Sequence, residues 1–561
     1  MSEHLYSEEE VKDLTDRVFL LRQSIEEGKI HFASHLVGGF IESYEAIRLR
    51  SDGLVDPSSV DGRIRGATLA LRHFKYRDEA KSAISTGEIQ NAYFEMLFVQ
   101  FGWILDFMVK NGLNPHQASV ALMRDADFVK QVRGGLPELA AGIRAFWDQV
   151  AEAGAFHLQD GQQLKATFSG DLFPAHWENV VSTAGLYIDT IVLPCPILRI
   201  APILGIYPDD EVARLFVKHV LTAMTYRDVA TADVAPPIAL ILPHPDDIRR
   251  GENNGLFTRA EPAILKHAAY LFNREFQGLS HYQEFCSTLR TVSEIMAELK
   301  GADRLLFDTA WEPGAEAQLT RMMRDPPPVI FGLDREILGN HLFAASAGRM
   351  PQALASQEVA RHFGGTPFIG AETSWQYYKW FLDYESIGSN EEMQDRKSAH
   401  VTRALVAEGS RNLSWLGNVP PETVLEIRRN GHAEDLRKIL SAGLDELILL
   451  KPDNYYRTSD RVVENLNRAF EQHERQLLEA RNKKLKLFGI DVGSFVATGS
   501  IAVTAALTSN PTLGAASGIL GILGLPNLRE IRSKFKEQAA ADLARKNSPT
   551  GLLFKHLKSS R

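Results

Sequence analysis

The residues best suited to chemistry form one short segment in the middle of the chain. An apolar, strand-like run at 238–242 is followed, after one proline, by His244-Pro245-Asp246-Asp247. Imidazole and carboxylate groups bind metal ions and transfer protons, so this segment is a candidate for metal-assisted hydrolysis. An alternative interpretation involves no chemistry, because an aspartate such as Asp246 or Asp247 also caps helices.

This segment resembles the zinc-binding loop of the LmbE-like N-deacetylases, in which a strand also ends in His-Pro-Asp-Asp. The resemblance implies a zinc-dependent hydrolase in which His244 and one aspartate bind the metal and the neighbouring aspartate acts as general base. That family places the motif near its N-terminus, follows it with an acidic residue and takes a last ligand from a later His-containing segment. Here the motif lies mid-chain, Ile248 stands at the acidic position, and no HxDH-type segment follows.

Other catalytic signatures are missing from the sequence. It has no GxxxxGK[ST] phosphate loop, no GxGxxG after a strand, no HExxH and no GxSxG. Acidic pairs such as Glu391-Glu392 are interpreted as solvated surface, since nothing places them in a pocket. A Ser, His and Asp triad leaves no local signature, so the sequence offers no argument for one. We therefore expect no bound cofactor and favour a non-enzymatic role over an enzymatic one.

Length and composition are those of a folded, multidomain protein. The chain has 561 residues, an apolar fraction of 44% and a charged fraction of 24%, which predicts about two to four domains. The net charge of -9 argues against a protein that coats nucleic acid, because neutralising phosphates requires a positive surface. Cys195 and Cys286 form no disulfide framework and no CxxC pair, so a reducing cytoplasm is expected.

The N-terminus is interpreted as the start of a helix and not as a signal peptide. Its first residues are acidic, whereas a signal peptide begins with basic residues and continues with an apolar stretch. Ser7 is followed three positions later by Glu10, which is the arrangement of a capping box. We therefore expect the protein to remain in the cytoplasm.

Most of the chain before the C-terminal region is predicted to be helical. The run at 93–108 is apolar around most of a helix, which is typical of a central core helix, and Asn114-Pro115 is expected to begin the next helix. Two β-branched stretches, 186–193 and 238–242, are predicted strands. Strands separated by helices indicate a small α/β element within a mainly α-helical protein.

Composition also suggests where the domains end. Asp325-Pro326-Pro327-Pro328 is predicted to be an extended linker, because consecutive prolines hold the chain extended. An aromatic-rich helix at 375–384 is interpreted as a core face in preference to a ligand-stacking surface. The predicted organisation is an N-terminal helical domain at 1–165, a mixed α/β to helical domain at 166–325, a helical domain at 329–455 and a C-terminal region at 456–561.

The C-terminal region begins with a predicted long helix from Ser459 to Leu487. Apolar residues recur along it at alternating spacings of three and four, which is typical of a coiled-coil seam or of one face of a helix bundle. The candidate oligomerisation residues on this seam are Val463, Leu466, Phe470 and Leu477. His473 lies on the same seam and is interpreted as a packing residue.

Residues 487–528 differ most from the rest of the chain. Two apolar segments, 488–508 and 512–525, are joined at Ser509-Asn510-Pro511, and the one charge in the stretch is Asp491. The first segment is long enough to cross a bilayer as a helix, whereas the second is short unless it tilts or is buried in protein. The glycines that would let helices pack closely in lipid are Gly489, Gly493, Gly499, Gly514, Gly518, Gly521 and Gly524.

Basic residues flank this apolar hairpin on both sides. Arg481, Lys483, Lys484 and Lys486 precede it, and Arg529, Arg532, Lys534 and Lys536 follow it. Because basic flanks stay on the cytoplasmic side of a membrane, both ends of the hairpin are expected there. The alternative is a soluble hairpin that is buried in its own domain or between subunits.

Together these features predict a mainly α-helical protein with a small α/β element, a long C-terminal helix and a glycine-rich apolar hairpin. The expected function is that of a cytoplasmic sensor or interaction protein that the hairpin recruits to the inner membrane, as in a bacterial anti-phage or toxin-like effector. Expected partners are another protein or further copies of the chain, together with a membrane, and no nucleic acid. The alternatives are a zinc-dependent hydrolase that uses residues 244–247 and a non-enzymatic oligomeric scaffold.

Overall fold

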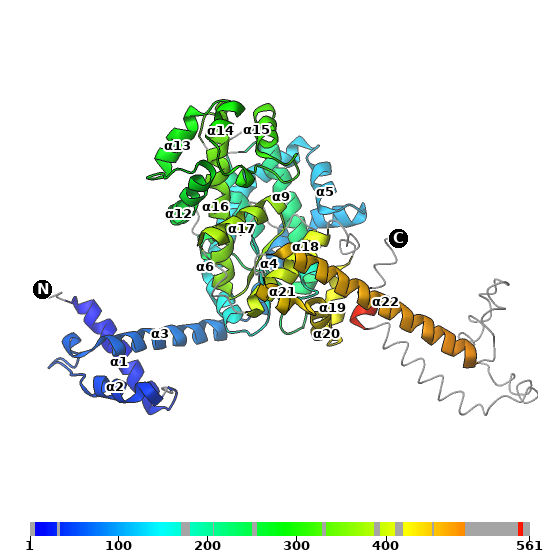
Figure 1. Ribbon diagram of the computed structural model, residues 1–561. Helices are drawn as coiled ribbons and strands as arrows, with labels where there is room; N and C mark the ends of the chain where they lie inside the picture. Colours follow the sequence, from blue (N-terminus) through cyan, green and yellow to red (C-terminus); the bar gives the residue numbers. More distant parts are fainter. Residues whose placement is uncertain are drawn as a thin grey trace, which may run out of the picture. The chain divides into compact units, whose positions relative to one another are not determined.

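The structure is a computed structural model of the chain (Figure 1). It describes residues 6–30, 34–169, 180–205, 207–248, 255–327, 332–385, 393–409, 419–450, 454–487 and 548–553. Some side chains inside helices, including that of Leu477, also lie outside the description. The seven glycines of the predicted hairpin fall at 489–524 and are therefore outside the described residues.

Helices dominate the described part of the chain, and four strands in it form a parallel sheet. This confirms the predicted mainly α-helical fold with a small α/β element. The chain divides into two compact units. One consists of residues 1–89 and 148–161, and the other of residues 90–147 and 162–561.

The first unit is a small helical body. It contains α1 (Glu8–Glu26), α2 (Ser34–Glu45), the 3-10 helix η1 (Pro57–Ser59) and α3 (Gly62–Ala83). The predicted capping box begins α1, because the Ser7 hydroxyl accepts from the Glu10 N–H and the Glu10 carboxylate accepts from the Ser7 N–H. Leu14, Leu21 and Ile64 are buried in the core of this unit.

Two long helices, α4 (Thr86–Lys110) and α6 (Ala126–Gln159), contribute to both units, and α5 (Pro115–Leu122) lies between them in the sequence. The predicted start of α5 is confirmed, because Asn114 caps it and Pro115 is its first residue. Tyr93 and Leu97 of α4 are fully buried. Within the described ranges, α4 is the one helix long and apolar enough to span a membrane, and core helices of soluble proteins pass the same test.

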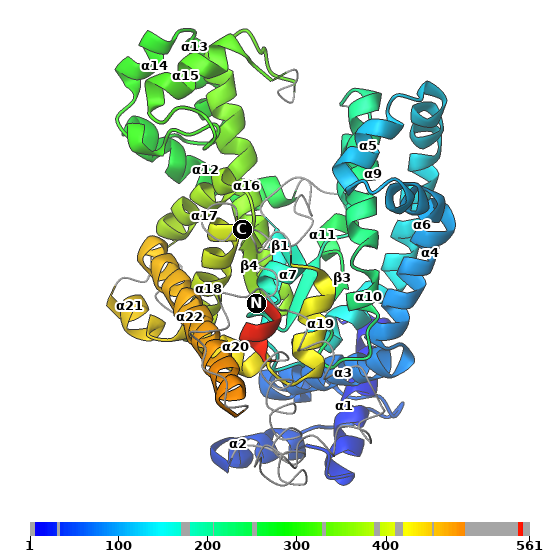
Figure 2. The ribbon, with the colours of Figure 1, turned by 90° about the vertical axis from the view of Figure 1, so that its right-hand side faces the viewer.

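The sheet belongs to the second unit. Its strands are β1 (Lys165–Ser169), β2 (Thr190–Leu193), β3 (Ala239–Ile241) and β4 (Thr366–Ile369), all parallel and in the order β3-β2-β1-β4 (Figure 2). The predicted strands at 186–193 and 238–242 correspond to β2 and β3. β1 and β4 are not predicted from sequence patterns, because both are short and β4 contains Pro367, which argues against a strand.

Pairing of β1 with β4 joins parts of the chain that the sequence analysis assigns to different domains. Residues 166–169 of β1 pair with residues 366–369 of β4, across the predicted linker at 325–328. The ranges 166–325 and 329–455 thus contribute strands to one sheet in one unit. Consecutive prolines report local stiffness, and the linker at 325–328 stays a prediction.

Several helices lie between β1 and the end of β3 in the sequence. They are α7 (Val180–Ala184), α8 (Pro196–Ile200), the 3-10 helix η2 (Ala201–Ile203), α9 (Asp209–Met224) and α10 (Arg227–Ala230), and α11 (Pro245–Ile248) follows β3. α9 begins at Asp209, directly after Pro208. Its many apolar residues are buried, and it packs against α5 and α8.

A group of helices with a common hydrophobic core follows. It consists of α12 (Gly255–Phe272), α13 (Leu279–Thr288), α14 (Val292–Glu298), the 3-10 helix η3 (Ala302–Arg304), α15 (Ala315–Arg324), α16 (Leu338–Phe363) and α17 (Glu372–Glu385). Trp375, Tyr378 and Phe381 are buried, which confirms the predicted core face of α17. Gly339 permits the close approach of α16 to α13, since a Cβ there would lie 1.9 Å from the Cys286 carbonyl oxygen.

The C-terminal helices are α18 (Met393–Gly409), α19 (Pro421–Arg429), α20 (Ala433–Ser441), α21 (Leu444–Leu450) and α22 (Tyr455–Leu487), and residues 549–553 form a last short helix. The long helix predicted at 459–487 is confirmed by α22 (Figure 1). Leu466 and Phe470 of its seam are buried, Val463 is half-buried, and α22 packs against α18, α20 and α21. This part of the seam is therefore one face of a helix bundle, and oligomerisation through it stays a prediction.

Candidate functional site at the carboxyl edge of the sheet

The carboxyl ends of the parallel strands lie at one edge of the sheet. There, β3 is followed by His244 and α11, β2 by Cys195 and α8, and β4 by Gly370 and α17. β2 and β3 are added on one side of β1 and β4 on the other, so the strand order reverses between β1 and β4. In open α/β sheets, ligands bind outside the carboxyl ends of the strands at such a reversal.

His244 caps a helix in this structure. Its Nδ1 accepts a hydrogen bond from the Asp246 N–H at 3.2 Å, immediately before the first turn of α11. The cap is thus the histidine and not Asp246 or Asp247, which both lie inside that turn. Burial lowers the pKa of His244 and outweighs the nearby carboxylates, so the ring is neutral near neutral pH and carries its proton on Nε2.

The two aspartates are paired with arginines from different helices. Arg259 of α12 donates to the Asp246 carboxylate at 2.7 Å and to both carboxylate oxygens of Glu358 at 2.9 Å. Asp247 is buried, and its carboxylate lies 3.6 Å from the guanidinium of Arg199 in α8. These ion pairs connect the loop after β3 to α8, α12 and α16.

The geometry does not fit a zinc centre. Among the residues that the structure describes, no group of three or more His, Cys, Asp or Glu side chains could hold a metal ion. The Nδ1 lone pair of His244 is engaged by a backbone N–H, and in the neutral ring the other nitrogen carries the proton, so neither nitrogen offers a lone pair to a metal. His362 contacts His244 edge to face, with ring centroids 5.1 Å apart. The described residues therefore do not bring together the ligand set that the N-deacetylase resemblance implies.

The first turn of α17, where β4 ends, contacts two arginines. Arg403 of α18 makes an ion pair with Glu372, and its guanidinium lies 4.8 Å from the centre of the Trp375 ring. Arg349 of α16 donates to the Ser374 hydroxyl at 2.9 Å. The guanidinium groups of Arg403 and Arg349 lie beside the N-terminal end of α17, where positive charge and the helix dipole favour an anionic group.

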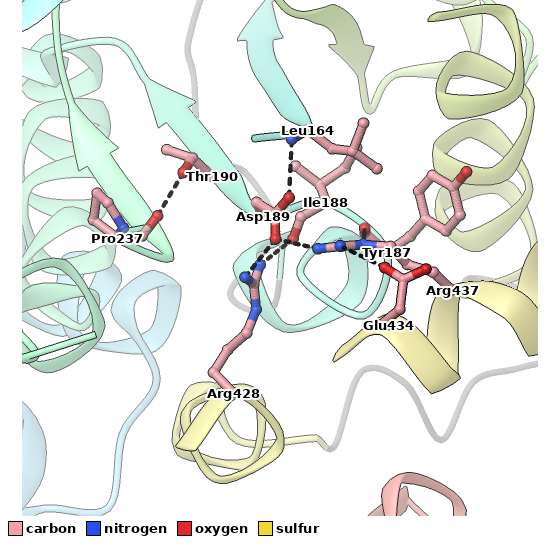
Figure 3. Close-up of polar contacts among 9 residues, drawn as sticks. All are labelled: Leu164, Tyr187, Ile188, Asp189, Thr190, Pro237, Arg428, Glu434 and Arg437. Atoms are coloured by element: carbon pink, nitrogen blue, oxygen red, sulfur yellow. Dashed lines mark hydrogen bonds and ion pairs between the residues drawn. The ribbon is translucent and has the colours of Figure 1, made fainter. Parts of the chain in front are cut away.

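The amino edge of the sheet carries a buried charge cluster (Figure 3). Asp189, directly before β2, accepts hydrogen bonds from Arg428 of α19 at 2.5 Å, from Arg437 of α20 and from the Leu164 N–H at 2.9 Å. Each arginine also donates to a backbone carbonyl just before Asp189 at 2.8 Å, and Glu434 lies 3.4 Å from Arg437. Because ligands of parallel sheets bind at the opposite edge, we assign this cluster a structural role in holding α19 and α20.

The sequence motif identifies His244, Asp246 and Asp247 at the carboxyl edge and gives no sign of the arginines. Arg199, Arg349 and Arg403 lie in helices that are far apart in the sequence, and no local motif marks them. The available signal is the short apolar run at 366–369 followed by Gly370. If this run is interpreted as a strand, the helix that follows it, α17, is expected to begin at the edge of the sheet.

Comparison of the chain with known protein families, with curated proteins and with solved structures gives no match. No family is therefore assigned to it.

Proposed function

We propose that the chain is a cytoplasmic interaction protein whose C-terminal apolar segment, residues 488–525, acts on a membrane. The observation that carries this proposal is the composition of that segment, in which Asp491 is the single charge and basic residues lie on both sides. At 1.5 Å per residue, a helix over 488–508 spans roughly 30 Å, which is about the thickness of the hydrocarbon core. In water each glycine would cost a helix about 1 kcal/mol relative to alanine, and close packing in lipid offsets that cost.

The residues on either side of the segment support the same proposal. α22 ends at Leu487, directly before the segment, and the short helix at 549–553 belongs to the same unit as α22. A chain that leaves one body and returns to it would keep both basic flanks on one side of a bilayer. This agrees with the rule that basic flanks stay on the cytoplasmic side.

A membrane-active hairpin on a helical body also suggests an effector, such as an anti-phage or toxin-like protein that perturbs the bacterial inner membrane. This part of the proposal rests on analogy of architecture. It requires that the segment makes a bilayer leak. A segment that only anchors the protein would bind a bilayer and leave it intact.

Vesicle flotation tests the membrane proposal. Vesicles of phosphatidylethanolamine and phosphatidylglycerol should carry the full chain upward in a density gradient, whereas a chain ending at Lys486 should remain at the bottom.

Val503→Asp puts a charge in the first apolar segment. An aspartate costs about 2.5 to 3.5 kcal/mol at the centre of a spanning helix, so binding should fall by roughly a hundredfold. Asn527→Asp adds the same charge outside the two segments and should float like the parent. Equal flotation of both variants would contradict the proposal.

Dye release from the same vesicles tests the effector role. The full chain should release a trapped fluorophore, and Val503→Asp should release it no faster than buffer does. Flotation without release would limit the segment to anchoring and remove the effector role.

A second candidate function is recognition of a small anionic ligand, which would make the α/β element the sensor. The reversal of strand order beside Arg349 favours it. Thermal unfolding with ATP or with inorganic phosphate tests it, because a ligand at a hundred times its dissociation constant stabilises the folded chain by about 2.7 kcal/mol. Arg349→Gln should abolish the shift, and a matched change at the exposed Arg274 should not. No shift with either probe would count against this candidate.

A further inference from the structure

The part of α4 that belongs to the second unit has one side in contact with solvent. Val99 and Trp103 lie on that side, and they are 69% and 55% exposed. Tyr93, Leu97 and Ile104 lie on the opposite side and are buried. Figure 2 shows α4 at the right-hand edge of the second unit. The structure thus leaves two large apolar side chains at the middle of a long helix exposed to water.

The Trp103 ring is held in place by the next long helix. Its centroid lies 5.8 Å from that of Phe128 in α6, and the two rings are nearly perpendicular. Phe128 is buried, so this contact fixes the orientation of the indole. A side chain that is already ordered loses little conformational entropy when a partner covers it. Tryptophans of this kind are enriched at the centres of protein interfaces.

Three charged residues share this side of α4. Glu95 and Lys110 lie toward its two ends, and Asp106 lies between them. All three are exposed, and none forms an ion pair with another residue that the structure describes. At 1.5 Å per residue, Glu95 and Lys110 are about 22 Å apart along the helix, so they cannot pair within one chain.

These charges decide which class of partner fits the exposed side. A bilayer would have to take up Glu95 and Asp106 together with Val99, and carboxylates are costly in hydrocarbon. A protein surface can cover the apolar centre and pair the charges at the rim. The length and apolar composition of α4 therefore do not make a lipid surface its preferred partner.

We propose that this side of α4 is a homodimer interface, in which it packs antiparallel on the same side of α4 in a second copy. A two-fold axis repeats every contact, so Val99 of each copy faces Trp103 of the other. Lys110 of each copy then lies within one turn of Glu95 of the other, which two long side chains can bridge. The antiparallel direction also brings the ends of the two helix dipoles next to ends of opposite sign.

A second copy fits better than a different protein because the charges are self-complementary. Glu95 precedes the centre formed by Val99 and Trp103, and Lys110 follows it. Reversing the direction of the helix therefore brings the base next to the acid at both ends, and two copies supply both ion pairs by themselves. This interface does not involve residues 488–525, so it is independent of the membrane proposal.

Sedimentation velocity of the full chain over a wide range of concentrations tests the dimer. The mass should rise from that of one chain to that of two. Val99→Asp puts a charge at the centre of the interface and should raise the dissociation constant at least about tenfold. Gln100→Asp is the matched control, because it adds the same charge about 100° further round the helix. It should leave the dissociation constant within about twofold of that of the parent.

A charge exchange identifies the partner as a second copy. Glu95→Lys or Lys110→Glu alone should raise the dissociation constant about tenfold, because like charges then meet twice in each dimer. The two changes together should return it to within about threefold of the parent value. Since the two residues cannot meet within one chain, this recovery is expected only if Glu95 of one copy contacts Lys110 of another.

Three results would overturn the dimer. They are a mass of one chain at every concentration, an association that Val99→Asp leaves unchanged, or a double variant as weak as either single one. The second result would show that copies associate through another surface. A mass of one chain together with weaker vesicle flotation of Val99→Asp would assign this side of α4 to a lipid surface in place of a second copy.

Discussion

Among single residues, Gln90 completes the edge of the sheet. β3 is an edge strand, and the Gln90 side chain donates to the Ile241 carbonyl at 3.0 Å while its own oxygen accepts from the Ile241 N–H at 2.8 Å. The amide group thus bonds to β3 as a neighbouring strand would. Gln90 is buried, so water cannot replace these bonds.

Replacing this amide should be costly. Gln90→Leu leaves two buried backbone groups of Ile241 without partners, each at about 1 to 3 kcal/mol, so we expect a loss of about 2 to 6 kcal/mol in the free energy of unfolding. Urea unfolding followed by circular dichroism measures it. Gln100→Leu, at an exposed position of the same helix, should change stability by less than about 0.5 kcal/mol. A similar small loss in both variants would show that the two bonds contribute little.

His267 makes stability depend on pH. Burial, with a contribution from Arg304, lowers the pKa of His267 to about 3. Its Nδ1 lies 3.0 Å from the Tyr384 hydroxyl, and the Trp380 ring stacks on it with centroids 5.5 Å apart. An unfolded histidine titrates near pH 6.5, so between these two values the unfolded chain binds a proton that the folded chain does not.

This histidine should therefore destabilise the fold as the pH drops below about 6.5, by about 1.4 kcal/mol per pH unit down to its folded pKa. At pH 5 the loss is about 2 kcal/mol relative to pH 8. Urea unfolding of the parent and of His267→Phe at both pH values measures it, and the variant should lack this part of the slope. His116→Phe, at an exposed position, should keep the slope. An unchanged slope in His267→Phe would contradict the assignment.

At the scale of elements, Asp189 connects the sheet to two helices. It lies directly before β2 and pairs with arginines from α19 and α20, and all three side chains are largely buried (Figure 3). Removing one partner from a buried ion pair leaves the others charged and without compensation. The cluster should therefore control whether α19 and α20 stay on the amino edge of the sheet.

Asp189→Asn should lower the free energy of unfolding by about 3 to 5 kcal/mol. Hydrogen exchange should locate the loss, with faster exchange in α19 and α20 than in α12 and α16. Glu434→Gln is the matched control, because Glu434 is 64% exposed in its pair with Arg437 and should contribute less than about 1 kcal/mol. Equal effects of the two variants would contradict the structural role of the cluster.

At the scale of the whole molecule, the question is whether α22 holds one chain together or joins several. Its seam residues Leu466 and Phe470 are buried within the chain. Leu466→Ala should lower the free energy of unfolding by about 2 to 5 kcal/mol and leave the mass in light scattering unchanged. Val463→Ala, at a half-buried position of the same helix, should cost less. A drop in mass with Leu466→Ala would support the oligomeric scaffold.

The sequence by itself determined the local elements. The capping box at Ser7, the start of α5 after Asn114, the long helix α22 and the apolar face of α17 follow from periodicity and end signals within a few residues. The strands β2 and β3 were also predictable, because they are apolar, β-branched and preceded or followed by turn residues. These features depend on residues that are close together in the sequence, so a single sequence is enough to predict them.

The tertiary structure alone decided the sheet order and the charge pairs. β1 and β4 are too short to predict, and their pairing joins residues about two hundred positions apart, which no local pattern encodes. The role of His244 changed for the same reason: its spacing to Asp246 suggested a metal site, whereas Arg259 and Arg199, from distant helices, take up the two aspartates. Long-range packing selects among the interactions that the local sequence permits.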